Sequence, residues 1–341
     1  MNPGEIVRGT RSAVGLFDMA HRGLLEVRGE DRLRWLDGMI SGDVQALGDG
    51  APGAGCYAML LTNRGAIIAD LHVARFEDRY LLESLRSEIP RIREALERYV
   101  IADDVALLDR SGEFVTLGLE GPAAPAVLEQ ATNGQISELE EEHWVESTIG
   151  GRGVLVAGFG FSGERGFQLR MQPDDHEGIE EALRSAAGGD TIVQGNFEAL
   201  ETLRIEAGLP ALGAELDEEV LPPEARLERA ISISKGCYVG QEIVARLRTR
   251  GKVNHLLVGL RLDSLALPEV GAVLSAEGRE TGELTSVAVS PTEGPIALGY
   301  VRRQHAEAGA EIEFKGGRAS VAALPFITGL AAVESAASGV T

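Results

Sequence analysis

The chain has 341 residues, 44% of them hydrophobic, and a formal net charge of −21. This length and hydrophobic content exclude a disordered polymer and allow two or three domains with their own cores. The negative charge argues against direct binding of nucleic acid or acidic membranes, and the absence of an apolar leader or of a run of roughly eighteen apolar residues argues against secretion or membrane insertion.

The N-terminal part predicts strands and helices in a repeated order. A strand over 24–29 meets a glycine and is followed by a helix-like segment at 31–36. The same order recurs at 115–121, where Pro122 stands early in the next helix. The sequence therefore indicates a weak duplication.

The segments between and after the two copies complete an α+β pattern. Residues 67–73 and 79–85 predict strands, and apolar residues at helical spacing predict a helix over 89–99. A further helix begins near Phe197 and is predicted to end at Gly208, because Pro210 follows this glycine.

A formal dinucleotide fingerprint lies at 158–163 as Gly-Phe-Gly-Phe-Ser-Gly. Such a motif has to open a helix that receives the pyrophosphate. The next residues, 166–171, alternate like a strand, so we interpret the glycines as a hairpin connection and reject a Rossmann domain. The sequence also contains no P-loop, zincin or nucleophile-elbow motif, and its six histidines show no metal-ligand spacing.

Short strands separated by glycine or proline dominate the C-terminal part and predict a small barrel. They are expected at 256–260, 272–274, 284–287, 297–300 and 311–314. The segment 329–341, rich in Ala, Ser and Gly, is expected to be disordered because it cannot bury enough apolar area.

The most informative segment is KGCYVGQE at 235–242. Lys235 could lower the pKa of the Cys237 thiol, and Tyr238 could assist it. A buried, inert cysteine is an equally good interpretation from the residues alone. Cys56 and Cys237 form no CxxC pair, which is typical of a reducing cytoplasm.

KGCYVGQE resembles the signature of the YgfZ-type folate-binding proteins, which are relatives of the glycine-cleavage T-protein, an aminomethyltransferase. The resemblance extends over about residues 8–325 and includes the segments 15–19, 41–44, 63–65, 162–167, 203–208 and 284–286. It implies two interlocked ferredoxin-like α+β subdomains over 1–250 and a C-terminal antiparallel β-barrel over 251–328. The three parts would surround a central folate pocket.

The resemblance also implies site residues. Tetrahydrofolate or a derivative is the expected cofactor, with the Glu206 carboxylate at the amino-pyrimidine edge of the pterin. The other expected folate contacts are Phe161, Glu164, Gln241, Arg246 and Arg248. A solvated helix carboxylate is the alternative interpretation of Glu206.

One position departs from the aminomethyltransferase pattern. The chain reads Ile68-Ala69-Asp70-Leu71 where these enzymes have paired aspartates, so Ala69 is expected at the position of the catalytic aspartate. Because an alanine cannot act as a carboxylate, the transferase step is expected to be lost.

Arg246, Arg248, Arg250 and Lys252 recur at period two, which predicts a strand with one basic face. This face suits a charged edge strand that discourages aggregation, or a clamp for the glutamate tail of folate or for an acidic partner. Interleaved aromatic residues, which nucleic-acid binding would need, are absent from this stretch.

These expectations combine into a hypothesis: a cytoplasmic, monomeric folate-binding protein that assists assembly or repair of iron–sulfur clusters. It would contact client or assembly proteins transiently, with Cys237, Lys235 and Tyr238 as the reactive group and no resident metal. The alternatives are a folate-dependent aminomethyl or methyl transferase and a non-catalytic folate-binding module.

Overall fold

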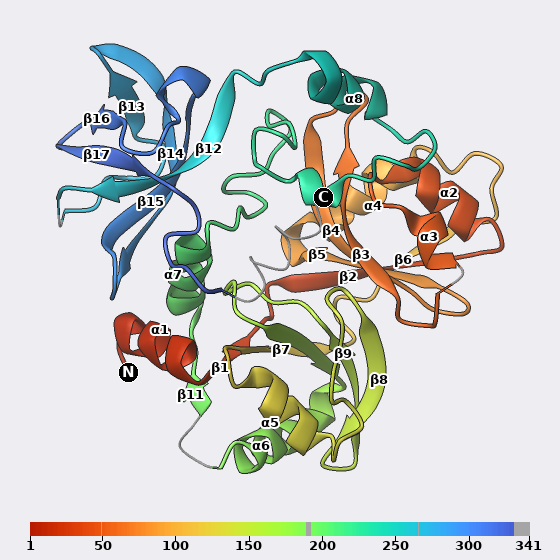
Figure 1. The fold of residues 1–341 in the computed structure, drawn as a ribbon. Coiled ribbons are helices and arrows are strands. Elements are labelled where there is room, and N and C mark those ends of the chain that lie inside the picture. The colour runs from red at the N-terminus through yellow and green to blue at the C-terminus, as the bar shows by residue number, and fades with distance from the viewer. Residues whose placement is uncertain (49, 189–191, 265, 331–341) are drawn as a thin grey trace.

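A computed structural model describes residues 1–48, 50–188, 192–264 and 266–330, with the backbone alone at 248–250. The described chain forms a five-stranded sheet, a six-stranded sheet and a closed six-stranded barrel, with helices on the sheets (Figure 1). The predicted α+β fold with a C-terminal antiparallel barrel is confirmed. The segment 331–341, most of the predicted disordered tail, lies outside the described residues.

The first sheet has the strand order β3-β4-β5-β2-β6. Its strands are β2 (Arg22–Arg28), β3 (Gly55–Leu61), β4 (Ile67–Arg75), β5 (Tyr80–Leu85) and β6 (Ala106–Asp109). The helices α2 (Arg32–Met39), α3 (Val44–Gly48) and α4 (Ile89–Glu97) share one hydrophobic core with it. The predicted strands near 67–73 and 79–85 and the helix that begins at Ile89 are therefore confirmed.

The second sheet has the order β11-β1-β7-β10-β9-β8. Its strands are β1 (Val14–Asp18), β7 (Val115–Glu120), β8 (Trp144–Ile149), β9 (Arg152–Ala157), β10 (Gly166–Met171) and β11 (Ile192–Gln194). It packs against α5 (Ala124–Ala131) and α6 (His176–Ala186). Because β1 lies in this sheet and the next strand, β2, lies in the first, the chain crosses between them and interlocks the two units.

The duplicated strand, glycine and helix order is confirmed, with β2 and α2 in the first sheet and β7 and α5 in the second. Gly29 and Gly121 end the two strands with φ of +107° and +131°, a region that L side chains rarely adopt. A Cβ at Gly29 would lie 1.9 Å from the carbonyl oxygen of Asp104, so the turn also needs glycine for space. The helix predicted near Phe197 is α7 (Phe197–Ala207), and Gly208 ends it in the left-handed conformation.

The barrel closes in the order β12-β15-β14-β13-β16-β17. Its strands are β12 (His255–Leu262), β13 (Val273–Ala276), β14 (Arg279–Ser290), β15 (Gly294–Arg302), β16 (Glu311–Phe314) and β17 (Gly317–Ala322). Five of these were predicted, and β17 was missed. The N-terminal helix α1 (Pro3–Ser12) packs on α7, which in turn contacts β14 of the barrel.

The predicted basic strand over 246–252 is wrong. Residues 241–250 form the helix α8 (Gln241–Arg250) instead. The side chain of Arg248 lies outside the described part of the structure.

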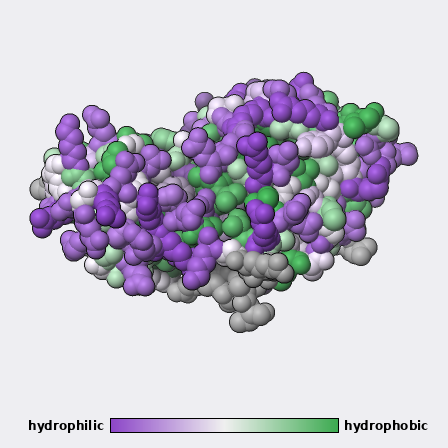
Figure 2. All heavy atoms as spheres, turned by 90° about the horizontal axis from the view of Figure 1, so that it is seen from above, coloured by the Kyte–Doolittle hydropathy of each residue, from purple (hydrophilic) through white to green (hydrophobic). Residues whose placement is uncertain are grey.

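On the face seen from above, hydrophobic residues gather in a central depression between two lobes that are mainly hydrophilic (Figure 2). Within the described ranges, none of the helices combines the length and the apolar character that crossing a bilayer requires.

Candidate functional site

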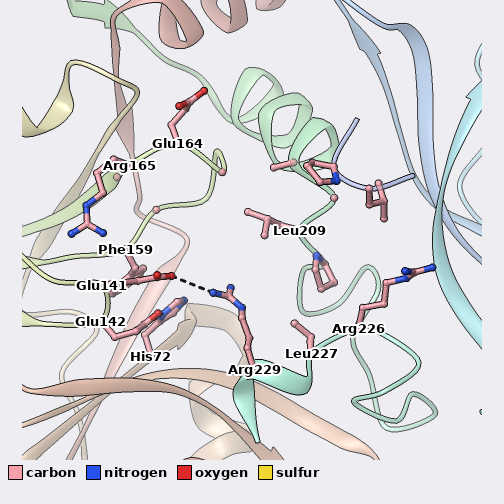
Figure 3. Close-up of a pocket in the computed structure, with 18 of the residues that line it drawn as sticks. His72, Glu141, Glu142, Phe159, Glu164, Arg165, Leu209, Arg226, Leu227 and Arg229 are labelled. Carbon is pink, nitrogen blue, oxygen red and sulfur yellow. Dashed lines mark hydrogen bonds and ion pairs between the residues drawn. The ribbon is translucent and has the colours of Figure 1, made fainter. Parts of the chain in front are cut away.

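A cavity of about 210 Å³ lies where both sheets, the end of α7 and the segment after β17 meet (Figure 3). Its labelled lining residues are His72, Glu141, Glu142, Phe159, Glu164, Arg165, Leu209, Arg226, Leu227 and Arg229. A dry cavity of about 150 Å³ takes up a benzene ring. The volume therefore suits a planar ring system somewhat larger than benzene.

The loop from Gly158 to Gly166 forms one wall of this pocket. It joins β9 to β10, which pair antiparallel, so the interpretation of the glycines as a hairpin connection is confirmed. A Cβ at Gly160 would lie 2.4 Å from Oε2 of Glu120 and 2.8 Å from the Cα of Gly166. These glycines let the loop pack closely on itself and on the buried Glu120.

Strand β4 contributes to the same wall, beside this loop. Tyr57 on β3 lies directly across from His72 on β4, and its hydroxyl donates to Oδ2 of Asp70 at 3.0 Å. The His72 ring stacks on Phe159 with centroids 3.7 Å apart and planes 3° apart. Burial, and next to it the Asp70 carboxylate, raises the pKa of Tyr57 well above its usual value, so this phenol stays protonated.

Charged side chains line the pocket beside this aromatic stack. Nδ1 of His72 lies 2.8 Å from Oε2 of Glu142, and Nη1 of Arg229 donates to Oε1 of Glu141 at 3.3 Å (Figure 3). The Arg229 guanidinium lies 4.9 Å from the ring centroid of Tyr57. The site thus offers carboxylate acceptors and a guanidinium donor beside an aromatic pair.

Asp70 lies next to the pocket-lining His72 on the same face of β4. Its Oδ1 is buried and has no hydrogen-bond partner among the described residues. A buried acceptor without a partner carries a desolvation cost, and Asp70 itself is not part of the pocket lining. Arg22 and Glu83 form a buried ion pair close to Asp70, in which Nε of Arg22 donates to Oε1 of Glu83 at 2.6 Å.

Ala69 points away from this site. It is fully buried in the core of the first sheet, and its direct partner on β3 is Leu60. Successive strand residues face opposite sides, so Ala69 and Asp70 cannot both face the pocket. The expectation that Ala69 removes a pocket carboxylate is corrected, because the carboxylate on the pocket side is Asp70.

Glu206 is buried but does not belong to the described lining of the pocket. Its carboxylate lies 3.0 Å from Nη2 of Arg11 and accepts from the Ser290 hydroxyl at 2.6 Å. The expected pterin contact is therefore occupied by protein partners. Glu164 does line the pocket and also pairs with Arg11 at 3.0 Å. Phe161 packs under Arg22, whose guanidinium carbon lies 4.6 Å from the centroid of the Phe161 ring.

The KGCYVGQE segment lies on the first sheet unit. The Lys235 ammonium donates to the carbonyl oxygens of Asp37, Ile40 and Gly42 at 2.6, 3.0 and 2.6 Å, and its side chain is only 1% exposed. Lys235 therefore anchors the segment to the end of α2. Tyr238 is buried in the core, where burial raises its pKa.

Cys237 is exposed, unlike Cys56, whose pKa burial raises to about 12. Gln241 begins α8 and Arg246 follows on the same helix, and neither lines the pocket described above. Among the described residues, no group of three or more His, Cys, Asp or Glu side chains could hold a metal ion.

The sequence did not single out His72, Glu142 or Arg229, which come from three distant segments. Asp70 and His72 carried a signal, since polar residues two apart on a predicted strand share one face. Glu141 and Glu142 belong to the acidic run 138–142, a pattern typical of a solvated loop.

Comparisons with known proteins agree with this architecture. Residues 5–235 match the family model of the GCVT N-terminal domain, and residues 256–327 match that of the glycine cleavage T-protein C-terminal barrel domain. The aminomethyltransferase of Streptomyces avermitilis is 32% identical over 326 residues, which cover 93% of this chain and 87% of that protein. The aminomethyltransferase of Chloroherpeton thalassium is 32% identical over 327 residues, which cover 94% of this chain and 89% of that protein.

Among solved structures, the chain is similar to the glycine cleavage system aminomethyltransferase T from Bartonella henselae. The TM-score is 0.84 at 26% sequence identity, and the match covers 96% of this chain and 90% of the other.

Proposed function

Because the chain belongs to the glycine cleavage T-protein family, we propose that it binds a reduced folate in the central pocket and transfers a one-carbon unit to or from it. The observation that carries this proposal is the pocket itself. A stacked His72–Phe159 pair and the Arg229 guanidinium line it, and the unpartnered Oδ1 of Asp70 lies on the same face of β4 as His72.

The residues present fit a reduced folate. The stacked Phe159 and His72 rings form an aromatic part of the pocket wall, and Leu209 and Leu227 add apolar lining that suits a pterin ring. Carboxylates of Glu141 and Glu142 are suitable acceptors for the N–H groups of an amino-pyrimidine ring. Tetrahydrofolate, when bound, supplies the amine nitrogens that carry the one-carbon unit.

In this proposal Asp70 moves the proton. Its carboxylate would accept or return a proton at the nitrogen that gains or loses the one-carbon unit, which is general acid–base catalysis. The Tyr57 hydroxyl, which stays protonated, holds Oδ2 in place and leaves Oδ1 for this role. Arg229 would position the ligand beside it, next to the Tyr57 ring.

Titration calorimetry with tetrahydrofolate, followed by turnover with aminomethyl and methyl donors, tests the proposal. Asp70→Asn should keep folate binding within a few fold and lower kcat by roughly 10²- to 10⁴-fold, as is usual when a general acid–base group is lost. Ala69→Asp serves as the companion variant. It should lower stability because it buries a carboxylate in the core, and it should not raise turnover.

Two results would contradict the proposal. Absence of saturable folate binding by the native chain would remove the pocket assignment. A gain of transfer activity in Ala69→Asp would return the catalytic role to position 69.

A second candidate function is assistance to iron–sulfur cluster assembly or repair, and the exposure of Cys237 favours it. Lys235 and Tyr238 fix the backbone on either side, so the thiol is presented at a defined place. Cys237→Ser should then leave folate binding intact and lower the activity of cluster-dependent client enzymes in cells, whereas unchanged client activity would reject this role. The cytoplasmic location and the monomeric state remain predictions.

A further inference from the structure

A second hollow, of about 150 Å³, lies in the second sheet unit between α5, β10 and the loop that follows α5. Its apolar walls include Leu128, Ile136, Leu139 and Phe167, and Glu138 and Arg165 supply charges. Among the described lining residues, Arg165 alone also belongs to the central pocket. In Figure 3 the Arg165 side chain extends away from Leu209 and Leu227, so its charged end is directed out of the central pocket.

Hydrogen bonds fix the walls of this hollow to one another. The Thr132 hydroxyl donates to the carbonyl oxygen of Leu128 at 2.8 Å and accepts from the backbone N–H of Ile136 at 3.2 Å. The carbonyl oxygen of Arg165 accepts from the N–H of Gly121, just before α5, at 3.2 Å. The hollow is therefore formed before any ligand binds, as is usual for small-molecule sites.

Two opposite charges line the hollow without pairing. Among the described residues, neither Glu138 nor Arg165 has an ion-pair partner, and they do not pair with each other. Arg165 is half-buried, and its guanidinium lies 5.6 Å from the ring centroid of Phe167. A guanidinium that lies beside an aromatic wall and has no carboxylate partner is unexpected in a chain with 53 acidic and 32 basic residues.

A larger hollow beside α4, of about 320 Å³, shows the opposite arrangement. Its arginines Arg91 and Arg98 pair with Glu218 and Glu94 at 2.5 and 2.8 Å. These charges are compensated within the protein and call for no charged ligand. Glu138 and Arg165 lack this compensation, and the space between them suits a ligand that carries a charge of each sign.

We propose that the 150 Å³ hollow binds a free apolar α-amino acid of about the size of leucine. The carboxylate of the ligand pairs with Arg165, its ammonium pairs with Glu138, and its side chain enters the apolar cavity. A dry cavity of about 150 Å³ takes up a benzene ring, so an isobutyl or benzyl group fits. Burial of such a side chain and two exposed ion pairs correspond to a dissociation constant of about 1 mM. The site goes beyond the proposed folate pocket and does not depend on it.

An NMR titration of the full chain with L-leucine tests the site, at ligand concentrations up to about 20 mM. Saturable shifts of backbone amides should appear over 125–139 and 165–167 and not over 207–209 or 225–229, which belong to the central pocket. L-alanine should bind about tenfold more weakly, because its side chain buries less apolar surface.

Ligands that lack one charge test the two ends of the site separately. 4-Methylpentanoate is leucine without its amino group, and 3-methylbutylamine is leucine without its carboxylate. Arg165→Gln should weaken the binding of L-leucine and 4-methylpentanoate by about fivefold and leave that of 3-methylbutylamine within about twofold. Glu138→Gln should weaken L-leucine and 3-methylbutylamine and leave 4-methylpentanoate within about twofold.

Neither side chain is fully buried, so both variants should fold. Arg165→Lys keeps the positive charge and should retain most of the affinity for L-leucine. Arg8→Gln and Glu177→Gln remove the same charges from exposed positions outside the hollow and should bind L-leucine like the native chain. Three results would overturn the site: no saturable shift in the native chain, shifts confined to the central pocket, or native affinity for L-leucine in Arg165→Gln.

Discussion

Glu120, at the end of β7, holds the loop that forms one wall of the pocket. It is fully buried and accepts hydrogen bonds from the backbone N–H of Phe161 at 3.0 Å and from the hydroxyl of Ser162 at 2.8 Å. Burial outweighs these bonds and raises its pKa to about 7. The glycine loop that forms one wall of the pocket is therefore held by a carboxyl group that titrates near neutral pH.

The raised pKa makes stability depend on pH. Between about pH 4.5 and 7 the folded chain holds this proton more tightly than the unfolded chain, so the contribution of Glu120 to the free energy of unfolding falls as the pH rises through this window. The fall amounts to roughly 3 kcal/mol at about 1.4 kcal/mol per pKa unit. Denaturant titrations at pH 5 and 8 should show a lower free energy of unfolding at pH 8 in the native chain, and this difference should be absent in Glu120→Gln. The exposed Glu177→Gln should keep the native slope, and an unchanged slope in Glu120→Gln would contradict the assignment.

At the scale of elements, the Lys235 anchor ties the KGCYVGQE segment to α2. The ammonium satisfies three carbonyl oxygens near the end of that helix and lies 3.0 Å from Oδ1 of Asp37. A cation at a helix C-terminus also interacts favourably with the helix dipole. The buried Lys235 side chain therefore holds the N-terminal part of the segment, while Tyr238 packs in the core.

Lys235→Met should lower the free energy of unfolding by about 3–5 kcal/mol, because the buried Asp37 carboxylate loses its ion-pair partner and three carbonyl groups lose a hydrogen-bond donor. Amide hydrogen exchange should become faster over 36–44 and 232–240. Exposed Lys315→Met is the control and should change neither quantity. A stability loss below about 1 kcal/mol would mean that the ammonium is dispensable for the anchor.

The element predicted wrongly from sequence was α8. The period-two spacing of Arg246, Arg248 and Arg250 predicted a strand, but this spacing concerned charges and not apolar residues. Ile243, Val244 and Leu247 follow helical spacing, and Val244 is buried in the core of the first sheet unit. Apolar periodicity carried the correct signal because burial, and not surface charge, decides the local conformation.

At the scale of the whole molecule, local patterns predicted a weakly duplicated α+β part and a barrel because both follow apolar periodicity, and the division into two interlocked units came from the family resemblance. The pocket could not be derived in this way. His72, Glu142 and Arg229 come together only when β4, the loop before β8 and the segment after Pro222 are folded against one another. The motif resemblance indicated a central pocket and assigned Glu206 to it, yet the partners of that carboxylate are Arg11 and Ser290.

The barrel is joined to the α+β part by the buried carboxylate of Glu215. Its Oε1 accepts from the hydroxyls of Thr285 and Ser286 on β14, and its Oε2 lies 2.9 Å from Nη1 of Arg204 on α7. The Tyr300 hydroxyl on β15 donates to the Glu215 carbonyl oxygen at 2.9 Å. The side chain of Glu215 thus connects α7 with β14, and its backbone carbonyl adds a contact with β15.

Glu215→Ala should weaken the contact between α7 and the barrel. Removing one partner of a buried ion pair costs about 3–5 kcal/mol, because the Arg204 guanidinium stays buried with less compensation. We expect calorimetry to show one unfolding transition for the native chain and a separate, earlier transition of the barrel in the variant, since the α+β cores are untouched. Exposed Glu219→Ala should retain the native profile. A single transition at the native temperature in Glu215→Ala would mean that apolar contacts alone, such as those of Ile205 with Leu298 and Phe326 in their shared cluster, hold the barrel in place.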